Sequence, residues 1–169
     1  MSRLAFALAA ALVAGSSALA LAAEEPSGCA GFKWPLDKER AALLATKAPV
    51  ANGGALAYGA AAAAQLKPLE EAGLPEPPER ASKGEPGNAG HFTLPAPPKA
   101  GVYKVTIADY AWVDILDEGK FLHPEGFSGA KDCEGARKSV KFDLPARPLD
   151  IQFSGVHNTD LSVIVTPAE

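Results

Sequence analysis

This chain of 169 residues contains few cysteines, histidines and aromatic residues: two Cys, three His, and 7% Phe, Trp and Tyr together. Two cysteines are too few for a disulfide-dense mini-protein. The 16 Lys and Arg are outnumbered by 20 Asp and Glu, and this disfavours a nucleic-acid binder, because phosphates are neutralised by a basic surface. With 47% hydrophobic and 21% charged residues, the composition excludes an intrinsically disordered chain and indicates one globular domain.

The chain also lacks an apolar run of the length that spans a bilayer, about 20 residues. Its longest run, residues 4–14, follows Arg3 and precedes small residues up to Ala22 and Ala23. This pattern predicts a secretory signal peptide over residues 1–23. Its removal takes away Arg3 and no acid, so the net charge moves from −4 to −5. We therefore expect a periplasmic or secreted protein with no stable membrane insertion after cleavage.

Export determines how the two cysteines are interpreted. Cys29 and Cys133 are an even pair in an oxidising compartment, where pairing is the usual outcome. A redox pair or metal ligands are the alternatives, but neither cysteine stands in a C-x-x-C motif. We expect a structural Cys29–Cys133 disulfide that ties the mature N-terminus to a distant loop.

Residues 24–99 differ in composition from residues 100–169. Eight of the fifteen prolines fall between Pro68 and Pro98, which predicts an extended arm rather than a helix or a central strand. One amphipathic helix is expected over residues 36–46, with a face made of Leu36, Arg40, Leu43 and Leu44. The alanine run at residues 60–64 is ambiguous, and we interpret it as part of an edge strand in which Ala64, Leu66 and Pro68 alternate with polar residues.

Short runs with period-two alternation follow from residue 91 onward. They predict strands at residues 91–94, 101–107, 111–116, 121–122, 138–144, 149–154 and 161–166, with a loop over residues 124–135. Eight of the twelve aromatic residues lie in this part. The predicted fold is a mostly β, antiparallel β-sandwich with a jelly-roll-like layout, whose core is residues 100–169 and on which the helix and arm of residues 24–99 pack as part of one domain.

The three histidines suggest one metal hypothesis. His91, His123 and His157 together with Glu125 supply the ligand types of a non-haem iron site. However, a cupin-type site needs His-x-His followed by Glu on one strand, whereas Pro124 separates His123 from Glu125. Exposed loop histidines are the alternative interpretation. Nucleophilic catalysis has no motif here, since G-x-S-x-G, a P-loop and a dinucleotide fingerprint are all absent from the sequence.

Two aromatic residues favour binding. Tyr110 and Trp112 lie near the start of a predicted strand, and Trp112 alternates with the apolar Val113 and Ile115. An exposed Trp112 could stack on a sugar ring or an apolar ligand, whereas a buried one would fill the sandwich core.

Charged residues nearby are expected to be structural or solvated. The acids Asp109, Asp114, Asp117 and Glu118 suit turns and match no EF-hand loop. The basic residues Lys131, Arg137, Lys138 and Lys141 are interleaved with acids and predict a salt-bridged loop around Cys133.

Several segments resemble a family of small exported bacterial proteins whose members are sometimes catalogued as homogentisate 1,2-dioxygenase. The resemblance covers about the last 80 residues and the mature N-terminus, and it is carried by residues 29–35, 101–105, 111–115, 127–129, 137–140 and 152–155. It implies iron-dependent ring cleavage, although this chain departs from such an enzyme in its length, its export signal and its histidine spacing. The strand layout is also similar to pre-peptidase C-terminal jelly rolls and to carbohydrate-binding modules.

Two functional hypotheses follow. The first is a non-enzymatic binding or envelope-accessory protein whose partner is a small molecule, a glycan or an envelope protein. The second is a small iron-dependent enzyme that uses His91, His123, Glu125 and His157. A third interpretation is a module that adds a strand to a partner's sheet edge.

Overall fold

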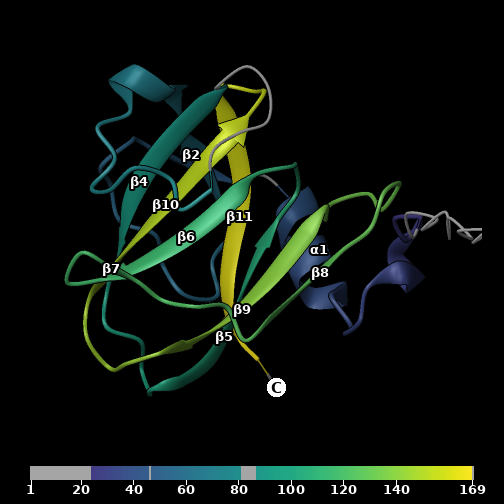
Figure 1. Cartoon of the computed structure of the whole chain (residues 1–169). Coiled ribbons are helices and arrows are strands. Elements are labelled where there is room, and N and C mark those ends of the chain that lie inside the picture. Colours follow the sequence, from purple (N-terminus) through teal and green to yellow (C-terminus); the bar gives the residue numbers. More distant parts are fainter. Residues whose placement is uncertain (1–23, 46, 81–86, 169) are drawn as a thin grey trace, which may run out of the picture.

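The computed structural model describes residues 24–45, 47–80 and 87–168, so the predicted signal peptide lies outside the described residues. Over these ranges the chain forms a two-layer β-sandwich with one α-helix (Figure 1). The mostly β, antiparallel sandwich expected from the sequence is thereby confirmed. None of the helices in the described ranges has the length and apolar character that a membrane crossing requires.

The first layer is a six-stranded sheet in the order β1-β2-β11-β5-β9-β8. All of its neighbouring strands are antiparallel except β1 and β2. Its strands are β1 (Ala48–Val50), β2 (Ala62–Gln65), β5 (Gly101–Ile107), β8 (Gly126–Gly129), β9 (Lys138–Leu144) and β11 (Asp160–Pro167).

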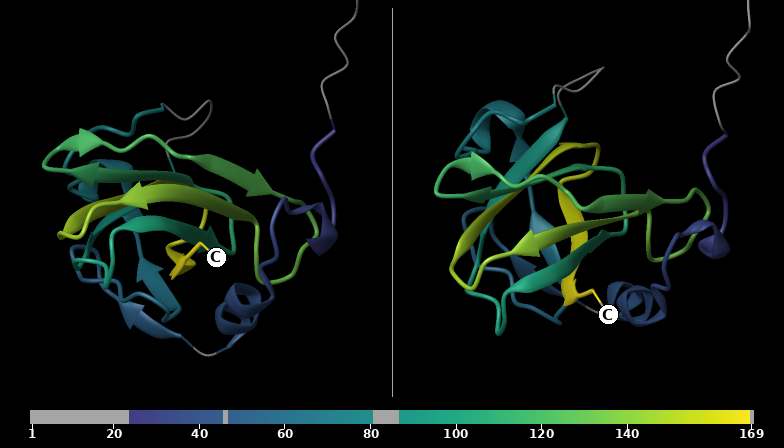
Figure 2. Two further views of the ribbon diagram at one scale, coloured as in Figure 1. Left: turned by 90° about the horizontal axis from the view of Figure 1, so that it is seen from below. Right: turned by 60° about the horizontal axis from the view of Figure 1, so that its bottom comes forward.

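The second layer is a five-stranded antiparallel sheet in the order β3-β4-β10-β6-β7. Its strands are β3 (Lys67–Pro68), β4 (Asn88–Leu94), β6 (Trp112–Asp117), β7 (Lys120–Phe121) and β10 (Leu149–Val156). Helix α1 (Asp37–Leu44) and two 3-10 turns, η1 (Cys29–Gly31) and η2 (Leu69–Glu71), complete the elements. Figure 2 shows α1 beside the end of β11, at the margin of the sandwich.

The core lies between the two layers, where alternate residues of each strand point inward. Val105 on β5, Phe142 on β9 and Phe153 on β10 are at most 1% exposed. On β5, β9, β10 and β11 every second residue forms a buried apolar set, in agreement with the predicted period-two alternation, because a half-buried strand must place every second side chain on its apolar face. At the β6–β7 hairpin, Glu118 and Gly119 have φ values of 51° and 77°, the geometry of a tight two-residue turn, at the predicted position.

The described residues of the 24–99 segment contribute buried residues to the core and also pack over the outside of the sandwich. Leu56, Ala64, Phe92 and Leu94 are buried in the same cluster as the C-terminal strands. The alanine run is a strand, as expected, but β2 is not an edge, because β1 pairs along its outer side. Leu66 then crosses between the layers, and Pro68 belongs to β3 of the other sheet. The core is therefore broader than residues 100–169.

The predicted arm covers the outer face of the five-stranded sheet. The carbonyl oxygen of Ala72 lies 2.8 Å from the donating Nδ2 of Asn52 and 3.2 Å from Nδ1 of His91 on β4. Further along, the backbone N–H of Glu79 donates to Asp114 on β6, at 3.3 Å. These contacts fix the arm across β4 and β6.

Two local expectations are corrected. The helix ends at Leu44 rather than at residue 46, and Leu44 is 52% exposed, whereas Glu39 is buried beside Leu43. Glu39 takes this place because Lys104 and Thr166 of the underlying strands bind its carboxylate. The expected loop over residues 124–135 contains β8, which Phe127 and Ser128 form by pairing with β9.

Candidate functional site

Trp112 lies outside the main core, on the outer face of β6. Its neighbours Val113 and Ile115 point between the sheets and are 5% and 0% exposed, whereas Trp112 is half-buried. Alternation along the strand therefore places the indole on the face opposite the core, which decides between the two alternatives left open by the sequence.

Asp114 holds the indole in position. Its carboxylate is buried and accepts three hydrogen bonds: from Trp112 Nε1 at 2.6 Å, from Gln152 Nε2 at 3.1 Å and from the Glu79 N–H at 3.3 Å. Gln152 is the direct cross-strand neighbour of Asp114 on β10. A solvated turn acid was expected here, but Asp114 is in mid-strand under the arm, where a buried carboxylate requires several donors.

Two cations contact the ring that Asp114 positions. The guanidinium carbon of Arg80 lies 4.8 Å from the centroid of the Trp112 ring, and Lys138 Nζ lies 4.7 Å from it. Both distances are within the range of cation–π attraction. Lys138 also donates a 3.1 Å hydrogen bond to the carbonyl oxygen of Ala111. Arg80 comes from the arm and Lys138 from the start of β9, so both layers contribute to this site.

The surroundings of Lys138 change its acidity. Burial is the main cause that lowers the pKa of its ammonium group to about 8; the positive charges of Arg137 and Arg80 add to this effect, and the Asp114 carboxylate opposes it. Lys138 is therefore a cation at neutral pH that loses its charge in mildly alkaline solution.

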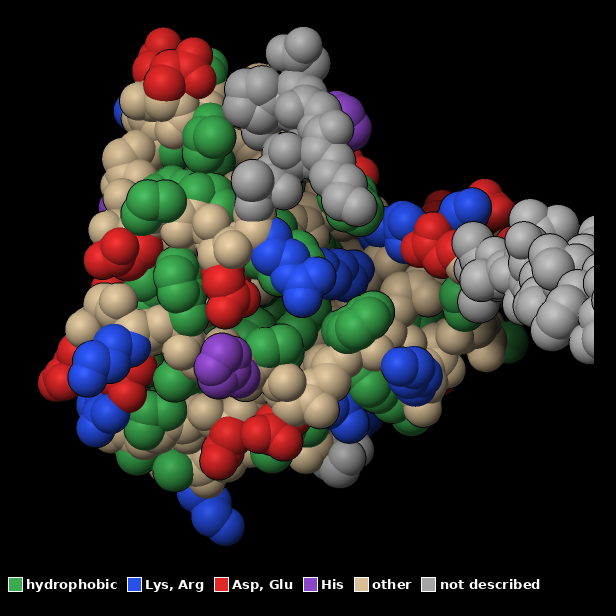
Figure 3. All heavy atoms as spheres, in the orientation of Figure 1, with side chains coloured by type: hydrophobic (Ala, Val, Ile, Leu, Met, Phe, Trp, Pro, Cys, Tyr) green, Lys and Arg blue, Asp and Glu red, His purple; other side chains and the backbone are tan. Residues whose placement is uncertain are grey.

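Tyr110 extends the site toward solvent. Its side chain is 54% exposed, and the guanidinium of Arg137 lies 5.8 Å from its ring centroid. Arg137 also forms an ion pair of 2.6 Å with Glu25. We call the group Tyr110, Trp112, Arg80, Arg137 and Lys138 the Trp112 patch. Figure 3 shows Lys and Arg side chains gathered beside hydrophobic ones on the face that carries β6.

Sequence reasoning identified the two aromatic residues of the Trp112 patch but missed the role of two cations. The expected salt-bridged loop is divided: Lys131 and Arg137 approach Glu25, whereas Lys138 contacts Trp112. The signal for Lys138 was its phase, because it lies two residues before Val140 and four before Phe142, on the inward-facing side of β9. Arg80 carried no signal, since its position depends on the path of the arm.

The four candidate iron ligands come from three separate parts of the fold, since His123 and Glu125 share the connection between β7 and β8. His91 is half-buried on β4, while His123, Glu125 and His157 are exposed in connections between strands. Within the described residues, no three His, Cys, Asp or Glu side chains come together in a group that could hold a metal ion. This arrangement gives the iron hypothesis no support.

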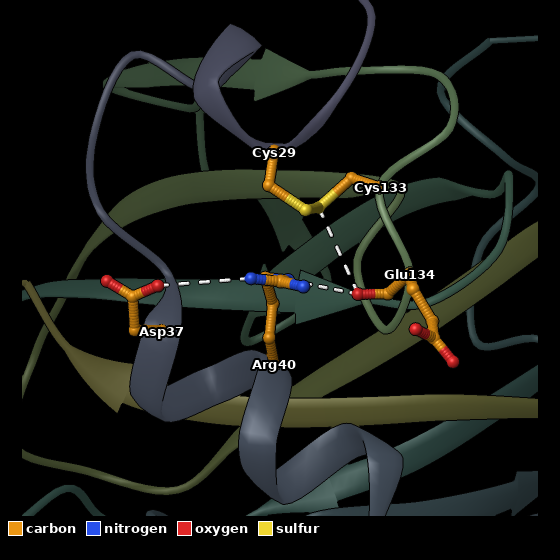
Figure 4. The surroundings of a disulfide bond; sticks show 5 residues. All are labelled: Cys29, Asp37, Arg40, Cys133 and Glu134. Atoms are coloured by element: carbon orange, nitrogen blue, oxygen red, sulfur yellow. Dashed lines mark hydrogen bonds and ion pairs between the residues drawn. A yellow bond between two sulfur atoms is a disulfide. The ribbon is translucent and has the colours of Figure 1, made fainter.

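The predicted Cys29–Cys133 disulfide is present (Figure 4), with a Cα–Cα distance of 4.6 Å. It fixes the N-terminal segment against the outer side of the six-stranded sheet. Beyond it, the backbone N–H of Lys33 donates to Ser128 Oγ at 2.9 Å, and Trp34 Nε1 donates to Ser139 Oγ at 3.1 Å. Arg40 of α1 donates to the carbonyl oxygen of Glu134 in the same loop, at 3.0 Å.

Comparison of the chain with protein-family models, with curated proteins and with solved structures finds no match. The family resemblance described from the sequence therefore stays a prediction.

Proposed function

We propose that this chain is an exported, non-enzymatic binding protein whose Trp112 patch binds a glycan that carries carboxylates. The observation that supports this most is the placement of Arg80 on the Trp112 ring. Arg80 is exposed, and no ion pair joins it to a carboxylate elsewhere in the described residues. A guanidinium in this position can bind a carboxylate through two parallel N–H bonds while its plane rests on the indole.

The aromatic residues of the Trp112 patch would bind the sugar rings of the glycan. Tyr110 offers an exposed ring to the apolar face of a sugar, and Trp112 is held in one orientation by Asp114. The exposed ring of Tyr110 favours a polymer lying across the surface over a small molecule inside a cavity.

The charge distribution favours an acidic ligand. The whole chain has a net charge of −4, yet Arg80, Arg137 and Lys138 lie around the two aromatic rings. Local positive potential within an acidic protein attracts anions to that place. Export, which the N-terminal sequence predicts and the disulfide suits, would bring the chain to the carboxylated glycans outside the cytoplasm.

Isothermal titration calorimetry with an oligogalacturonate and an oligomaltose of equal length tests the proposal. We expect the charged oligomer to bind and the neutral one to bind at least roughly tenfold more weakly, because a charge-assisted bond contributes about 1.5–3 kcal/mol. Arg80→Gln and Tyr110→Ala should each weaken binding. Phe127→Ala is the matched control, since Phe127 is an exposed aromatic on β8 with Lys33 over its ring. Equal binding of both oligomers, or no binding of either, contradicts the proposal.

Export is tested separately. The full chain should be recovered from the periplasm or the medium, and Edman sequencing should place the mature N-terminus next to Ala22 or Ala23. Recovery of the uncleaved chain from the cytoplasm would contradict this part of the proposal.

A further inference from the structure

A hollow of about 370 Å³ lies where α1 meets the outer face of the six-stranded sheet. Trp34 and Glu39 line it from the N-terminal segment, and Lys104, Lys141 and Thr166 line it from β5, β9 and β11. None of the five residues of the Trp112 patch lines this hollow, so it is a separate place in the molecule.

The aromatic wall of the hollow is fixed. Trp34 Nε1 donates a 3.1 Å hydrogen bond to Ser139 Oγ, and that hydroxyl is itself 3.1 Å from Thr106 Oγ1. Ser139 and Thr106 are both 0% exposed. Since the disulfide holds the segment before Trp34, the indole is positioned without any ligand.

Asp37 and Lys38 of α1 also line the hollow, and Asp37 forms an ion pair of 3.9 Å with Arg40 of the same helix. Two of the other charges in the hollow neutralise each other. Lys104 Nζ lies 2.8 Å from Glu39 Oε1, and their side chains are 11% and 6% exposed. Thr166 Oγ1 donates a further 2.6 Å bond to the same oxygen. This pair is satisfied within the protein.

Lys141 is different. Its Nζ lies 4.3 Å from the centroid of the Trp34 ring, and in the described part of the chain no ion pair links it to a carboxylate. An ammonium group that is half-buried against an indole and lines a hollow is a binding group for an anion.

We infer that this hollow is a second binding site, for a small organic carboxylate whose charged end lies on Lys141 and whose flat apolar body packs beside Trp34. Pro35 and Pro167 provide the remaining apolar lining. The volume is near the lower end of the range for small-molecule sites, about 300–1,000 Å³, so it fits one compact molecule rather than a polymer. This inference goes beyond the proposed function and does not depend on it.

Two-dimensional ¹H–¹⁵N NMR can observe both places at once. The chain has two tryptophans, Trp34 and Trp112, so its indole N–H signals are two, and Trp34→Phe and Trp112→Phe assign them. Benzoate is the probe, with benzamide as its neutral isostere and inorganic phosphate as an anion without an apolar body. We expect benzoate to shift the Trp34 signal and to bind at least roughly tenfold more tightly than either of the others.

Variants test the charge. Lys141→Met should weaken benzoate binding at least roughly tenfold, and Lys141→Arg should retain it. Lys67→Met, which removes an exposed lysine from β3 on the other sheet, should have no effect. A dispersed spectrum shows that each variant is folded.

The inference is wrong if benzoate leaves the Trp34 signal unchanged, if benzamide or phosphate binds as tightly, or if Lys141→Met binds benzoate normally. Failure of oligogalacturonate to shift the Trp112 signal would instead count against the proposed function alone, so the two failures are distinguishable.

Discussion

Trp112 and Asp114 lie two residues apart on the outer face of β6, and the indole Nε1–H donates a 2.6 Å hydrogen bond to the buried carboxylate. Spacing by two places both side chains on one face of the strand, and the arm and β10 complete the set of donors around Asp114. The orientation of the Trp112 patch thus depends on a residue that need not touch any ligand.

Asp114→Ala should lower the free energy of unfolding by about 2–4 kcal/mol, because it leaves the buried donors of Trp112 and Gln152 without their acceptor. Urea denaturation followed by circular dichroism measures this. Asp143→Ala, an exposed acid on β9, is the control and should change stability by less than about 0.5 kcal/mol. A similarly small change in Asp114→Ala would show that the carboxylate is not the organiser of the patch.

Stability should rise between about pH 8 and the ordinary pKa of lysine because of Lys138. Its pKa is lowered to about 8 by burial, so over that interval the unfolded chain binds more protons than the folded one. Below pH 8 the buried charge of Lys138 therefore lowers the free energy of unfolding. This destabilisation disappears as the pH rises toward the ordinary pKa of lysine. The shift from 10.5 to about 8 corresponds to about 3 kcal/mol.

Lys138→Met should remove that rise, and the difference between variant and wild type across this pH interval isolates the contribution of Lys138 from those of other titrating groups. Parallel pH profiles for the two proteins would contradict the assignment. Asp114, Arg137 and Arg80 are the charged groups that act on Lys138, so Arg80→Gln should raise its pKa.

The disulfide should contribute strongly to stability. Cys29 and Cys133 are separated by 104 residues, for which the chain-entropy relation gives about 4–5 kcal/mol. Cys29→Ser with Cys133→Ser should therefore lower the free energy of unfolding by about this amount, and dithiothreitol should lower the melting temperature of the wild type only. Unchanged melting of the double variant would contradict the expectation.

Glu39→Ala should destabilise the protein by about 3–5 kcal/mol, because it leaves the largely buried ammonium of Lys104 unpaired. Glu39→Leu combined with Lys104→Met should recover much of the loss, since removing both charges leaves neither one buried and unpaired. Thermal unfolding of the single and double variants measures the difference. If the single variant is no less stable than the double, the pair is not coupled as described.

Glu39 also gives a pH dependence in acid. Burial alone would raise the pKa of Glu39, but the bonds from Lys104 and Thr166 outweigh it, and the pKa lies below its ordinary value. The stabilisation is therefore present above the pKa of the unfolded chain and is lost as the pH falls through the lower pKa of the folded one. Glu39→Gln should lack this acid-dependent loss.

Local alternation predicted most of the fold. Strands β5 and β9 have their predicted bounds, since every second residue, such as Val105 or Phe142, is apolar and must be buried. Strand β8 was missed because its glycines interrupt the pattern around Phe127 and Ser128. Pairing with β9, a tertiary contact, decides its conformation.

The candidate sites were less predictable because they join distant residues. The face of Trp112 followed from alternation, but the placement of Arg80 over its ring follows from the course of the arm. Likewise, the burial of Glu39 requires Lys104 from β5 and Thr166 from β11, positions that no local pattern relates to α1. Residue type and spacing predict which face of a strand a side chain occupies, whereas the distant residue that it contacts depends on how the elements pack.

The most direct test of the binding function uses the Trp34→Phe variant, in which Trp112 is the remaining tryptophan. Its fluorescence is followed as oligogalacturonate is added at neutral pH and again above pH 9, where Lys138 is largely uncharged. We expect a saturable change at neutral pH that weakens in alkali and also weakens in Arg80→Gln. An emission spectrum that stays unchanged at neutral pH, or a change of equal size with Arg80→Gln, would contradict the proposal that the Trp112 patch binds acidic glycans.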